Sequence, residues 1–350
     1  MCKNIVYLYT EIMPYQTIVY KELSNLGYSV HAFYNDKNRQ TPFNPETIEN
    51  VYYYPNSEYT KKELSEKVFE LNPILLVVCG WSSSKYLYVA KKFKTTKTIP
   101  IVCPIDSQYI GRLKQRIGFL TAPFYIKKYF THIWVPGVRQ YHFARRMGYN
   151  VGNIIMNSLT GNIDLFHTAN ISQKKECYPK KILYVGRYNE VKGLRLFMDV
   201  WDSIKSKNGW SVVCAGNGPL KNILEGRKDV EVLDFQTQDK LVKLAENSGA
   251  FILPSNYEPW ALVLQEFAAA GLPILCSEAC GASPHFVINN YNGKTFKTND
   301  FEDLKSQIEW IINLPNDRLY EMACNSREVS KMVNPRISAA SLLGTLNTKI

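Results

Sequence analysis

The sequence of 350 residues lacks a long uninterrupted apolar run. No segment approaches the roughly 20 apolar residues that a membrane-spanning helix needs, so we predict no transmembrane span. The first residues, MCKNIVYLYTEIMPYQ, contain no apolar stretch followed by a small-residue cleavage site, so no secretory signal is expected. Together these absences predict a cytoplasmic protein.

Motifs for metal binding are missing as well. The chain has 8 cysteines and 5 histidines, but no CxxC pair and no histidines at metal-ligand spacing. Cys276 and Cys280 are the closest pair, while Cys79, Cys103 and Cys214 lie inside apolar runs. We therefore predict no metal site, and reduced cysteines in the cores, as is usual in the cytosol.

Acidic residues are scarce in the first half of the chain. Residues 1–165 contain 20 Lys and Arg against 11 Asp and Glu, whereas the remaining residues contain 22 against 20, so the net charge of +11 divides into +9 and +2. Such asymmetry indicates an anionic partner for the first half, such as nucleic acid, anionic lipid or a phosphorylated acceptor. Solubility alone is the alternative interpretation.

Short apolar runs alternate with longer amphipathic segments along the chain. Runs of this kind are typical of strands buried on both faces, and their alternation with helices predicts parallel sheets. Residues 157–180 interrupt the pattern and predict a connection between two domains. The predicted strands are 5–9, 29–34, 51–54, 74–79, 99–105, 132–136, 153–156, 181–186, 211–216, 230–235, 250–255 and 273–277.

The interruption divides the chain into two α/β domains of Rossmann-like, doubly wound type. We predict an N-terminal domain over residues 1–165 and a second domain over residues 166–335. Beyond about residue 302 the pattern is mostly helical, and Pro335 separates off a last helix in 336–350 that is expected to pack back on the first domain.

Two strand ends in the second domain carry groups suited to a diphosphate. In VGRYNEVKG (185–193), Gly186 permits a tight turn and the cations Arg187 and Lys192 follow. Ligands bind outside the carboxyl ends of parallel strands, and Arg and Lys suit phosphate there. In AGNGPL (215–220), Gly216 and Gly218 flank Asn217 and leave room for a ligand to approach the backbone closely. No G-x-G-x-x-G fingerprint occurs.

The segment FILPSNYEPWALVLQEFAAAGLPILCS (251–277) is the most informative. We predict that a buried strand ends at Pro254 and that Pro259 lies in the first turn of a helix. The amide groups of residues 260–263 (Trp260, Ala261, Leu262 and Val263) are then free to bind an anion. Glu258 and Glu266 are separated by roughly 12 Å along such a helix. One carboxylate is placed to bind a sugar and the other a ribose.

These motifs, in this order, resemble the donor-binding core of retaining glycosyltransferase family 4, which has the GT-B fold and an E-x7-E motif. The matching segments are Gly186-Arg187, Lys192-Gly193, 216–219, Pro254-Ser255, Glu258-Pro259-Trp260, Glu266 and 270–273. The resemblance implies two Rossmann-like domains facing a cleft. It also implies transfer of a hexose or N-acetylhexosamine with retention, without a metal, and with a UDP- or GDP-linked sugar as co-substrate and no cofactor.

The resemblance also implies residue roles. Arg187 and Lys192 hold the diphosphate and neutralise the leaving group, Glu258 binds the transferred sugar, and Glu266 binds the ribose. Backbone near Phe235 and Gln236 lies against the base. Stabilisation of the leaving charge by fixed cations and helix-end amides is the physical logic of such a site.

Two positions depart from the family pattern. Ala261 stands where the family usually has glycine, and its methyl group narrows the sugar pocket. Asp106 stands where the family often has a histidine at the end of a first-domain strand. Asp106 either stabilises positive charge or orients the acceptor at the reaction centre, or it caps a helix in IDSQYIG; both interpretations stay open.

The segment 110–130 mixes cations with large apolar residues (Arg112, Lys114, Arg116, Lys127 and Lys128 with Ile117, Phe119, Leu120, Phe124 and Phe130). A basic amphipathic surface can lie on an anionic membrane, which predicts a protein peripheral to the inner face of the cell membrane. The alternative is a helix whose apolar face belongs to the core.

Taken together, the sequence predicts a retaining glycosyltransferase that uses a saccharide or lipid-linked acceptor in bacterial cell-surface polysaccharide synthesis. Two other functions stay open. A GT-B sugar-nucleotide epimerase needs no separate acceptor, and a non-catalytic binder of nucleotides or nucleic acid is suggested only by the charge. No basic-aromatic motif of the RNA-binding type occurs, so nucleic acid is not expected as a partner.

Overall fold

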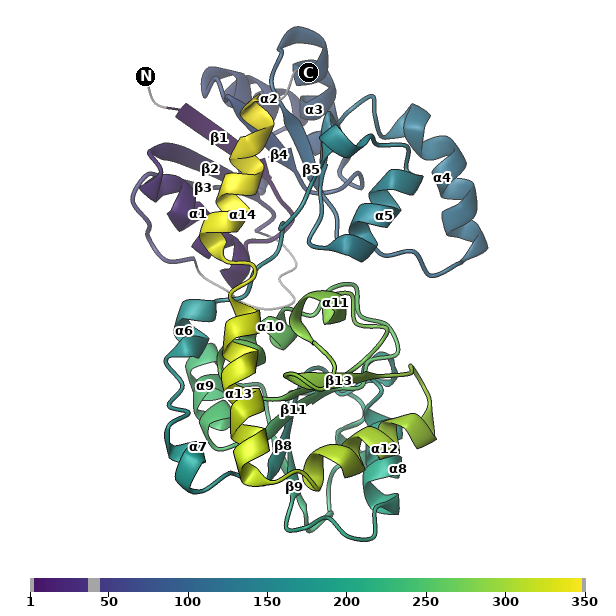
Figure 1. The fold of residues 1–350 in the computed structure, drawn as a ribbon. Coiled ribbons are helices and arrows are strands. Elements are labelled where there is room, and N and C mark those ends of the chain that lie inside the picture. Colours follow the sequence, from purple (N-terminus) through teal and green to yellow (C-terminus); the bar gives the residue numbers. More distant parts are fainter. Residues whose placement is uncertain (1–2, 37–44, 348–350) are drawn as a thin grey trace. The chain divides into compact units, whose positions relative to one another are not determined.

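The computed structural model describes residues 3–36 and 45–347, which form two compact α/β units (Figure 1). Unit 1 comprises residues 1–160 and 333–350, and unit 2 comprises residues 161–332. Residues 161–165 therefore belong to unit 2 rather than to the predicted N-terminal domain, because the helix that they begin packs on helices of unit 2. Among the described residues, no helix has the length and apolar character needed to cross a membrane.

Unit 1 is built on a seven-stranded sheet in the order β3-β2-β1-β4-β5-β6-β7, in which every pair is parallel. Its strands are β1 (Lys3–Leu8), β2 (Tyr28–Tyr34), β3 (Val51–Pro55), β4 (Leu75–Val78), β5 (Ile101–Pro104), β6 (His132–Trp134) and β7 (Ile154–Ile155). Its helices are α1 (Pro14–Asn25), α2 (Lys61–Glu70), α3 (Ser84–Thr96), α4 (Leu113–Tyr125), α5 (Val138–Arg146) and α14 (Pro335–Leu343).

Both faces of this sheet are buried, as the continuous apolar runs predict. Ile5 and Tyr7 of β1 belong to the core formed with α1 and α14. Val6 and Leu8 belong to the opposite core, formed with α2, α3, α4 and α5. This alternation follows from the two-residue period of a strand, and it places helices on both sides of the sheet.

Unit 2 contains a six-stranded parallel sheet in the order β10-β9-β8-β11-β12-β13. The strands are β8 (Lys181–Val185), β9 (Ser211–Ala215), β10 (Val230–Leu233), β11 (Ala250–Leu253), β12 (Ile274–Ser277) and β13 (Gly293–Phe296). The helices are α6 (Ile163–His167), α7 (Gln173–Glu176), α8 (Leu194–Ser203), α9 (Gln238–Glu246), α10 (Leu262–Ala269), α11 (Ser283–Phe286), α12 (Phe301–Ile312) and α13 (Asn316–Ser330).

Two features of unit 2 differ from the sequence prediction. Strand β13 was not predicted, because GKTF contains a glycine and a lysine and is a weak strand sequence; Gly293 is needed there, since a Cβ atom would collide with Ile274 of β12. The predicted connection 157–180 is not irregular throughout. It contains α6 and α7, and Phe166 of α6 packs edge-on against Phe267 of α10.

The end of the chain returns to unit 1. Pro335 occupies the first turn of α14, where its missing N–H is tolerated, and Asn334 caps the helix through Ile337 N at 2.8 Å. Figure 1 shows α14 beside α1, and Ala339 and Leu342 are buried in the core that α1 shares with the sheet. The last helix therefore completes one face of unit 1.

A buried lysine joins three segments of unit 2. The Lys174 side chain is 1% exposed, and its Nζ atom donates to the carbonyl oxygens of Ala245, Ser248 and Gly271 at 2.9, 2.8 and 3.4 Å. These carbonyls lie at the ends of α9 and α10, where helices leave acceptors unpaired. Burial lowers the pKa of Lys174 to about 7.

Lys174→Met should lower the free energy of unfolding by about 2 kcal/mol, because three buried carbonyl groups lose a donor that methionine cannot replace. Urea unfolding measures the change. The neighbouring and exposed Lys175 provides the control, since Lys175→Met should change stability by less than about 0.5 kcal/mol. Equal effects of the two substitutions would contradict this role for Lys174.

Candidate active site

Three neighbouring strands of unit 2 bring most of the predicted donor residues to one edge of the sheet. β9, β8 and β11 are adjacent and parallel, so the loops after their carboxyl ends share that edge. These loops are 186–193, 216–220 and 254–261. This is the edge at which open α/β sheets bind ligands.

The loop after β8 is held in a defined shape. The Tyr184 hydroxyl donates to the Arg187 carbonyl at 2.9 Å, and the Asn189 side chain accepts from Lys192 N at 3.1 Å. Gly193 adopts φ of 67°, and a Cβ atom there would collide with the Pro254 carbonyl. The lysine backbone is thus fixed before any ligand binds.

Lys192 and Glu258 form an ion pair across two of these loops. Their side chains are 18% and 14% exposed, so both charges are partly removed from water. Asn256 reinforces the junction, because its backbone N–H donates to the Val191 carbonyl at 2.8 Å and its side chain donates to the Glu190 carbonyl at 2.9 Å. The predicted Lys192 and Glu258 are therefore in direct contact.

Arg187, unlike Lys192, has no ion-pair partner in the described chain. Its side chain is exposed, and its guanidinium makes no hydrogen bond or ion pair with the rest of the described chain. It follows directly on Gly186 at the end of β8. A guanidinium in this position is available as a planar donor for phosphate oxygens.

The glycines of AGNGPL have a structural role that the sequence did not predict. A Cβ atom on Gly216 would collide with the Gly186 carbonyl, and one on Gly218 with the backbone of Tyr188. The two loops pair through Tyr188 N, which donates to the Asn217 carbonyl at 2.8 Å. Because glycine has no side chain, the two loops can pack together at these positions. This packing is sufficient to explain why glycine is present.

The start of α10 also differs from the prediction. The helix begins at Leu262, so Pro259 and Trp260 precede it, and Ala261 at the N-cap has φ of 83° and ψ of 75°. The carbonyl groups of the preceding residues are paired outside the helix: the Glu258 carbonyl accepts from Gly281 N at 2.9 Å and the Trp260 carbonyl from Ala282 N at 2.8 Å, and neither bond uses a predicted N–H group. Of the four predicted amides, those of Leu262 and Val263 lie in the first helical turn.

Glu266 lies within α10 and is 8% exposed. It accepts from the Gln238 side chain at 3.2 Å, and its Cγ atom leaves no space for a Cβ atom on Gly161. Burial raises the pKa of Glu266 to about 7. Strongly shifted carboxyl groups next to a cleft or strand edge are common at functional sites.

Phe235 and Gln236 follow β10, which is the edge strand of the sheet. The Phe235 ring is 71% exposed, whereas the Gln236 side chain donates to the Asp234 carbonyl at 2.9 Å. Tyr188 connects this strand to the β8 loop, since its hydroxyl donates to the Leu233 carbonyl at 2.8 Å. An exposed aromatic ring after an edge strand is chemically suited to stacking on a base.

Asp106 belongs to unit 1 and follows β5. The interpretation that it caps a helix is wrong, because the next helix, α4, begins only at Leu113 with Arg112 at its N-cap. The Asp106 carboxylate lies near Cys79, where burial raises the pKa of the thiol and Asp106 adds to that rise. Asp106 and Cys79 thus share the carboxyl edge of the other sheet.

Sequence reasoning missed several residues that shape the site: Tyr184, Tyr188, Asn189, Asn256 and Gln238. Tyr188, Asn189 and Asn256 lie inside the quoted motifs and Tyr184 directly precedes one, so their place at the strand ends is the signal that could have found them. Gln238 had no such signal. Within residues 3–36 and 45–347, no three His, Cys, Asp or Glu side chains are grouped as a metal site requires.

The architecture matches solved glycosyltransferase-type structures over nearly the whole chain. A sucrose-phosphate synthase from Thermosynechococcus elongatus has a TM-score of 0.75 at 16% identity, covering 98% of this chain and 97% of that one. An Anabaena protein in complex with UDP and glucose has a TM-score of 0.68 at 14% identity and covers 97% of both chains. Together with the two parallel sheets, these likenesses define the GT-B fold.

Residues 168–328, which lie within unit 2, match the family model described as Glycosyl transferases group 1. Among curated proteins, an uncharacterized glycosyltransferase of Methanocaldococcus jannaschii is 33% identical over 109 residues, which is 29% of this chain and 28% of the relative. The matches span less than half the length of the first curated relatives.

Ala261→Gly should raise the free energy of unfolding by about 1 kcal/mol, because alanine at positive φ is strained and glycine is not. Ala270 is the control: it is also buried, at 0% exposed against 8% for Ala261, but has an ordinary φ of −70°. Ala270→Gly should destabilise by about 1 kcal/mol. Chemical denaturation distinguishes the two, and a destabilising Ala261→Gly would contradict the strain.

Glu266→Gln should stabilise the ligand-free protein in a pH-dependent way. Below pH 4.5 the carboxyl group is protonated in both folded and unfolded chains and contributes no difference. Between pH 4.5 and about 7 the unfolded chain loses its proton first, so wild-type stability falls as pH rises, by roughly 3 kcal/mol in total. The advantage of glutamine should therefore grow over this range and be constant above it.

Urea unfolding at a series of pH values measures this advantage. Glu225→Gln, at an exposed position, should leave the pH profile of stability unchanged. A stability difference between Glu266→Gln and wild type that does not vary with pH would contradict the buried, protonated state of Glu266.

Proposed function

We propose that this chain is a retaining glycosyltransferase of family 4, with the E-x7-E motif formed by Glu258 and Glu266. It moves a hexosyl or N-acetylhexosaminyl group from a UDP- or GDP-linked donor to a saccharide or lipid-linked acceptor. The reaction needs neither a metal nor a cofactor. The setting is bacterial cell-surface polysaccharide synthesis in the cytoplasm, at the inner face of the membrane.

The observation that carries this proposal is the Lys192–Glu258 ion pair beside Arg187 at the carboxyl edge of the unit 2 sheet. A nucleotide sugar has a diphosphate that needs cations and a sugar that needs hydrogen-bond acceptors. Lys192 and Arg187 supply the first, and the Glu258 carboxylate supplies the second. The family match of residues 168–328 supports the same assignment.

The pair suits a site that is alternately empty and occupied. Without ligand, Glu258 balances the charge of a partly buried lysine, since an unpaired buried charge is costly. With a donor bound, Lys192 and the exposed Arg187 neutralise the diphosphate as it leaves, and Glu258 becomes available to sugar hydroxyls. Fixed cations of this kind stabilise a leaving group without reorganising during the reaction.

The remaining parts of the proposal concern the base and ribose of the donor, and the acceptor. Phe235 offers an exposed ring to the base, and Glu266 binds the ribose through its carboxyl group. Asp106 of unit 1 acts on the acceptor side. A peripheral contact with an anionic membrane belongs to the proposal as well, and α4 is the element that supports it.

A panel of UDP- and GDP-sugars tests the proposal through thermal stabilisation and slow donor hydrolysis. One donor should stabilise the wild type and be hydrolysed, with the released sugar keeping its anomeric configuration. Arg187→Ala and Glu258→Gln should each reduce turnover roughly hundredfold, as loss of a transition-state contact does. Added EDTA should leave the rate unchanged.

Two variants control for general effects. Arg195 pairs with Glu190 at 2.9 Å and Glu231 with Lys181 at 3.4 Å, both at exposed positions. Arg195→Ala and Glu231→Gln should keep wild-type turnover. Conversion of a donor to its epimer without release of sugar would favour the epimerase, and binding without any turnover would favour a non-catalytic protein.

A further inference from the structure

Helix α4 presents its apolar side to the solvent. Leu113, Ile117, Leu120 and Phe124 recur at helical spacing and are 71, 56, 75 and 84% exposed. Ala122 is the one buried residue of the helix. Single exposed apolar residues are ordinary, but four in a row on one helix face form a patch that marks an interaction surface. The core interpretation therefore holds for Phe119 and Phe130 of the predicted segment, which pack in or against the unit 1 core, and is wrong for Ile117, Leu120 and Phe124.

The helix also has a weak intrinsic tendency to form. Gly118 and Pro123 lie inside it, and these residues disfavour a helix by about 1 and 3 kcal/mol relative to alanine. A sequence that is poor for a helix and gains little from packing is expected to gain stability from a partner that covers its apolar face.

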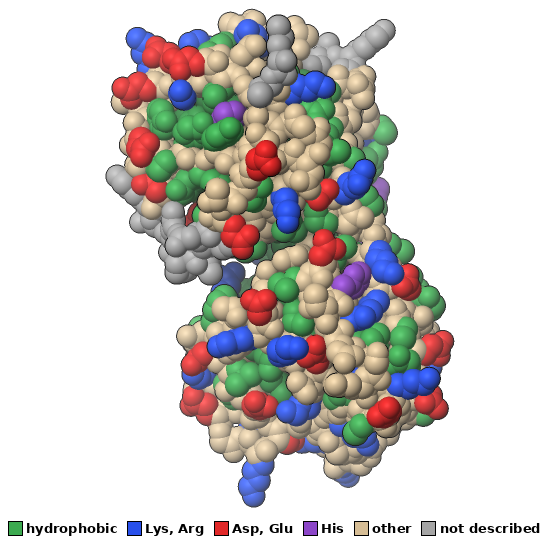
Figure 2. Space-filling view, turned by 90° about the vertical axis from the view of Figure 1, so that its left-hand side faces the viewer, with side chains coloured by type: hydrophobic (Ala, Val, Ile, Leu, Met, Phe, Trp, Pro, Cys, Tyr) green, Lys and Arg blue, Asp and Glu red, His purple; other side chains and the backbone are tan. Residues whose placement is uncertain are grey.

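Charge around α4 is of one sign. Residues 107–163 contain no Asp or Glu, and they carry eight of the cations of the chain: Arg112, Lys114, Arg116, Lys127, Lys128, Arg139, Arg145 and Arg146. Figure 2 draws the left-hand side of Figure 1, away from α4, and there acidic and basic side chains are interspersed. The concentration of positive charge is thus a local property of this part of unit 1.

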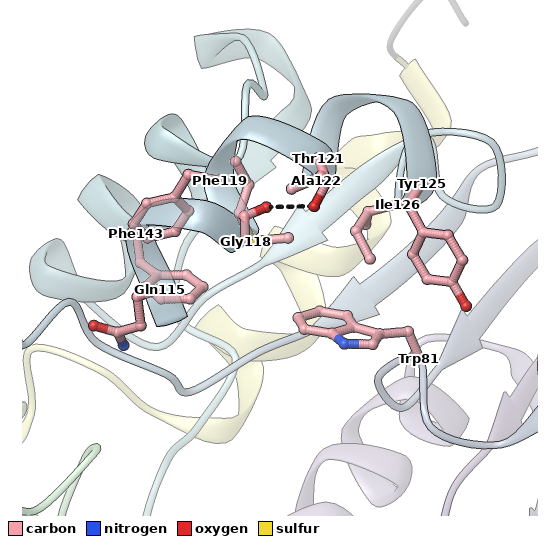
Figure 3. Close-up of a pocket in the computed structure, with 10 residues that line it drawn as sticks. Trp81, Gln115, Gly118, Phe119, Thr121, Ala122, Tyr125, Ile126 and Phe143 are labelled. Carbon is pink, nitrogen blue, oxygen red and sulfur yellow. Dashed lines mark hydrogen bonds between the residues drawn. The ribbon is translucent and has the colours of Figure 1, made fainter. Parts of the chain in front are cut away.

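An apolar pocket of about 220 Å³ lies beneath the helix (Figure 3). The inner side of α4 lines it through Phe119, Ala122 and Tyr125, α5 contributes Phe143, and the loop after β4 contributes Trp81. Figure 3 shows the Trp81 ring under the helix and Phe119 next to Phe143. Most of the lining is apolar, with Gln115 and Thr121 as the polar side chains, and such a lining suits a hydrocarbon chain better than a sugar.

The geometry points to α4 as a helix that docks on an anionic membrane surface, with its apolar face in the interfacial layer, its cations at the headgroups, and one lipid chain in the pocket beneath it. Apolar residues and lysines or arginines on one helix are the combination that binds such surfaces. A second copy of this chain fits less well, since each copy would bring the same excess of positive charge to the contact.

This inference extends the membrane contact of the proposed function and does not need the transfer reaction. α4 begins seven residues after Asp106, on the same β5–α4 connection, so docking would place the carboxyl edge of the unit 1 sheet close to the lipid surface. A lipid-linked acceptor would then reach that edge without leaving the membrane.

Co-sedimentation tests the docking with two kinds of vesicle, phosphatidylcholine alone and an equal mixture with phosphatidylglycerol. At low salt the protein should bind the anionic vesicles and not the zwitterionic ones, and high salt should weaken binding. Leu120→Gln with Phe124→Gln should reduce partitioning roughly tenfold or more. Lys114→Gln with Arg116→Gln should reduce it by roughly fivefold per cation.

Matched variants keep this test specific. Leu26→Gln with Met332→Gln removes two exposed apolar residues elsewhere, and Lys205→Gln with Lys240→Gln removes two exposed cations of unit 2. Both should bind like the wild type. Equal loss in all four variants, or no binding to anionic vesicles, would overturn the docking. If the α4 face instead binds a protein, either another protein or a second copy of this chain, complexes form in solution without vesicles. Such complexes would also count against membrane docking.

The pocket has its own measurement. Vesicles with brominated acyl chains should quench Trp81, which lines the pocket and is 36% exposed, and Trp81→Phe should remove that quenching. Binding without Trp81-dependent quenching would exclude the lipid chain from the pocket. Donor hydrolysis without vesicles should stay at the wild-type rate in the α4 variants, so failure of docking and failure of the proposed function are distinguishable.

Discussion

The contact between Lys192 and Glu258 is the interaction on which the proposed site depends. It joins the loop after β8 to the loop after β11, and both charges are partly buried, so neither is tolerated there without a partner or a ligand. The surrounding hydrogen bonds of Tyr184, Asn189 and Asn256 all fix the backbone of these two loops. A preformed pair of opposite charges at a strand edge is a suitable receptor for a molecule that carries both phosphate and hydroxyl groups.

Two residues of the proposed site lower the folding stability of the ligand-free protein. Ala261 adopts a conformation that glycine adopts without strain, and Glu266 is a carboxyl group held where burial opposes its ionisation. Sites that bind charged ligands often retain groups that lower the stability of the ligand-free protein, because those groups contribute to ligand binding. Ala261 is the N-cap of α10 and Glu266 lies within it, which is consistent with selection of this short helix for ligand binding.

Much of the fold followed from the sequence because buried parallel strands are continuous apolar runs between turn residues. Twelve of the thirteen strands in the described part of the chain were predicted, and the exception, β13, is a polar edge strand whose place depends on Gly293 fitting against Ile274. The motifs placed Lys192 and Glu258 on one edge but could not show that they touch. The roles of Gly216 and Gly218, and the start of α10 at Leu262, depend on loop-to-loop packing that no local pattern encodes.

The exposed face of α4 was an open alternative at the level of the sequence. Amphipathic spacing shows that a helix has an apolar side but does not show whether the rest of the protein covers that side.

The most direct measurement is the affinity for the free nucleoside diphosphate, UDP or GDP, whichever binds the wild type, by titration calorimetry. Lys192 and Glu258 have opposite consequences in this account. Lys192→Met should weaken binding roughly tenfold or more, because a cation facing the diphosphate is lost. Glu258→Gln should leave the affinity unchanged or increase it, since the lysine is released from its counter-charge. Equal affinities of Lys192→Met and wild type, or equal losses in both variants, would contradict the account.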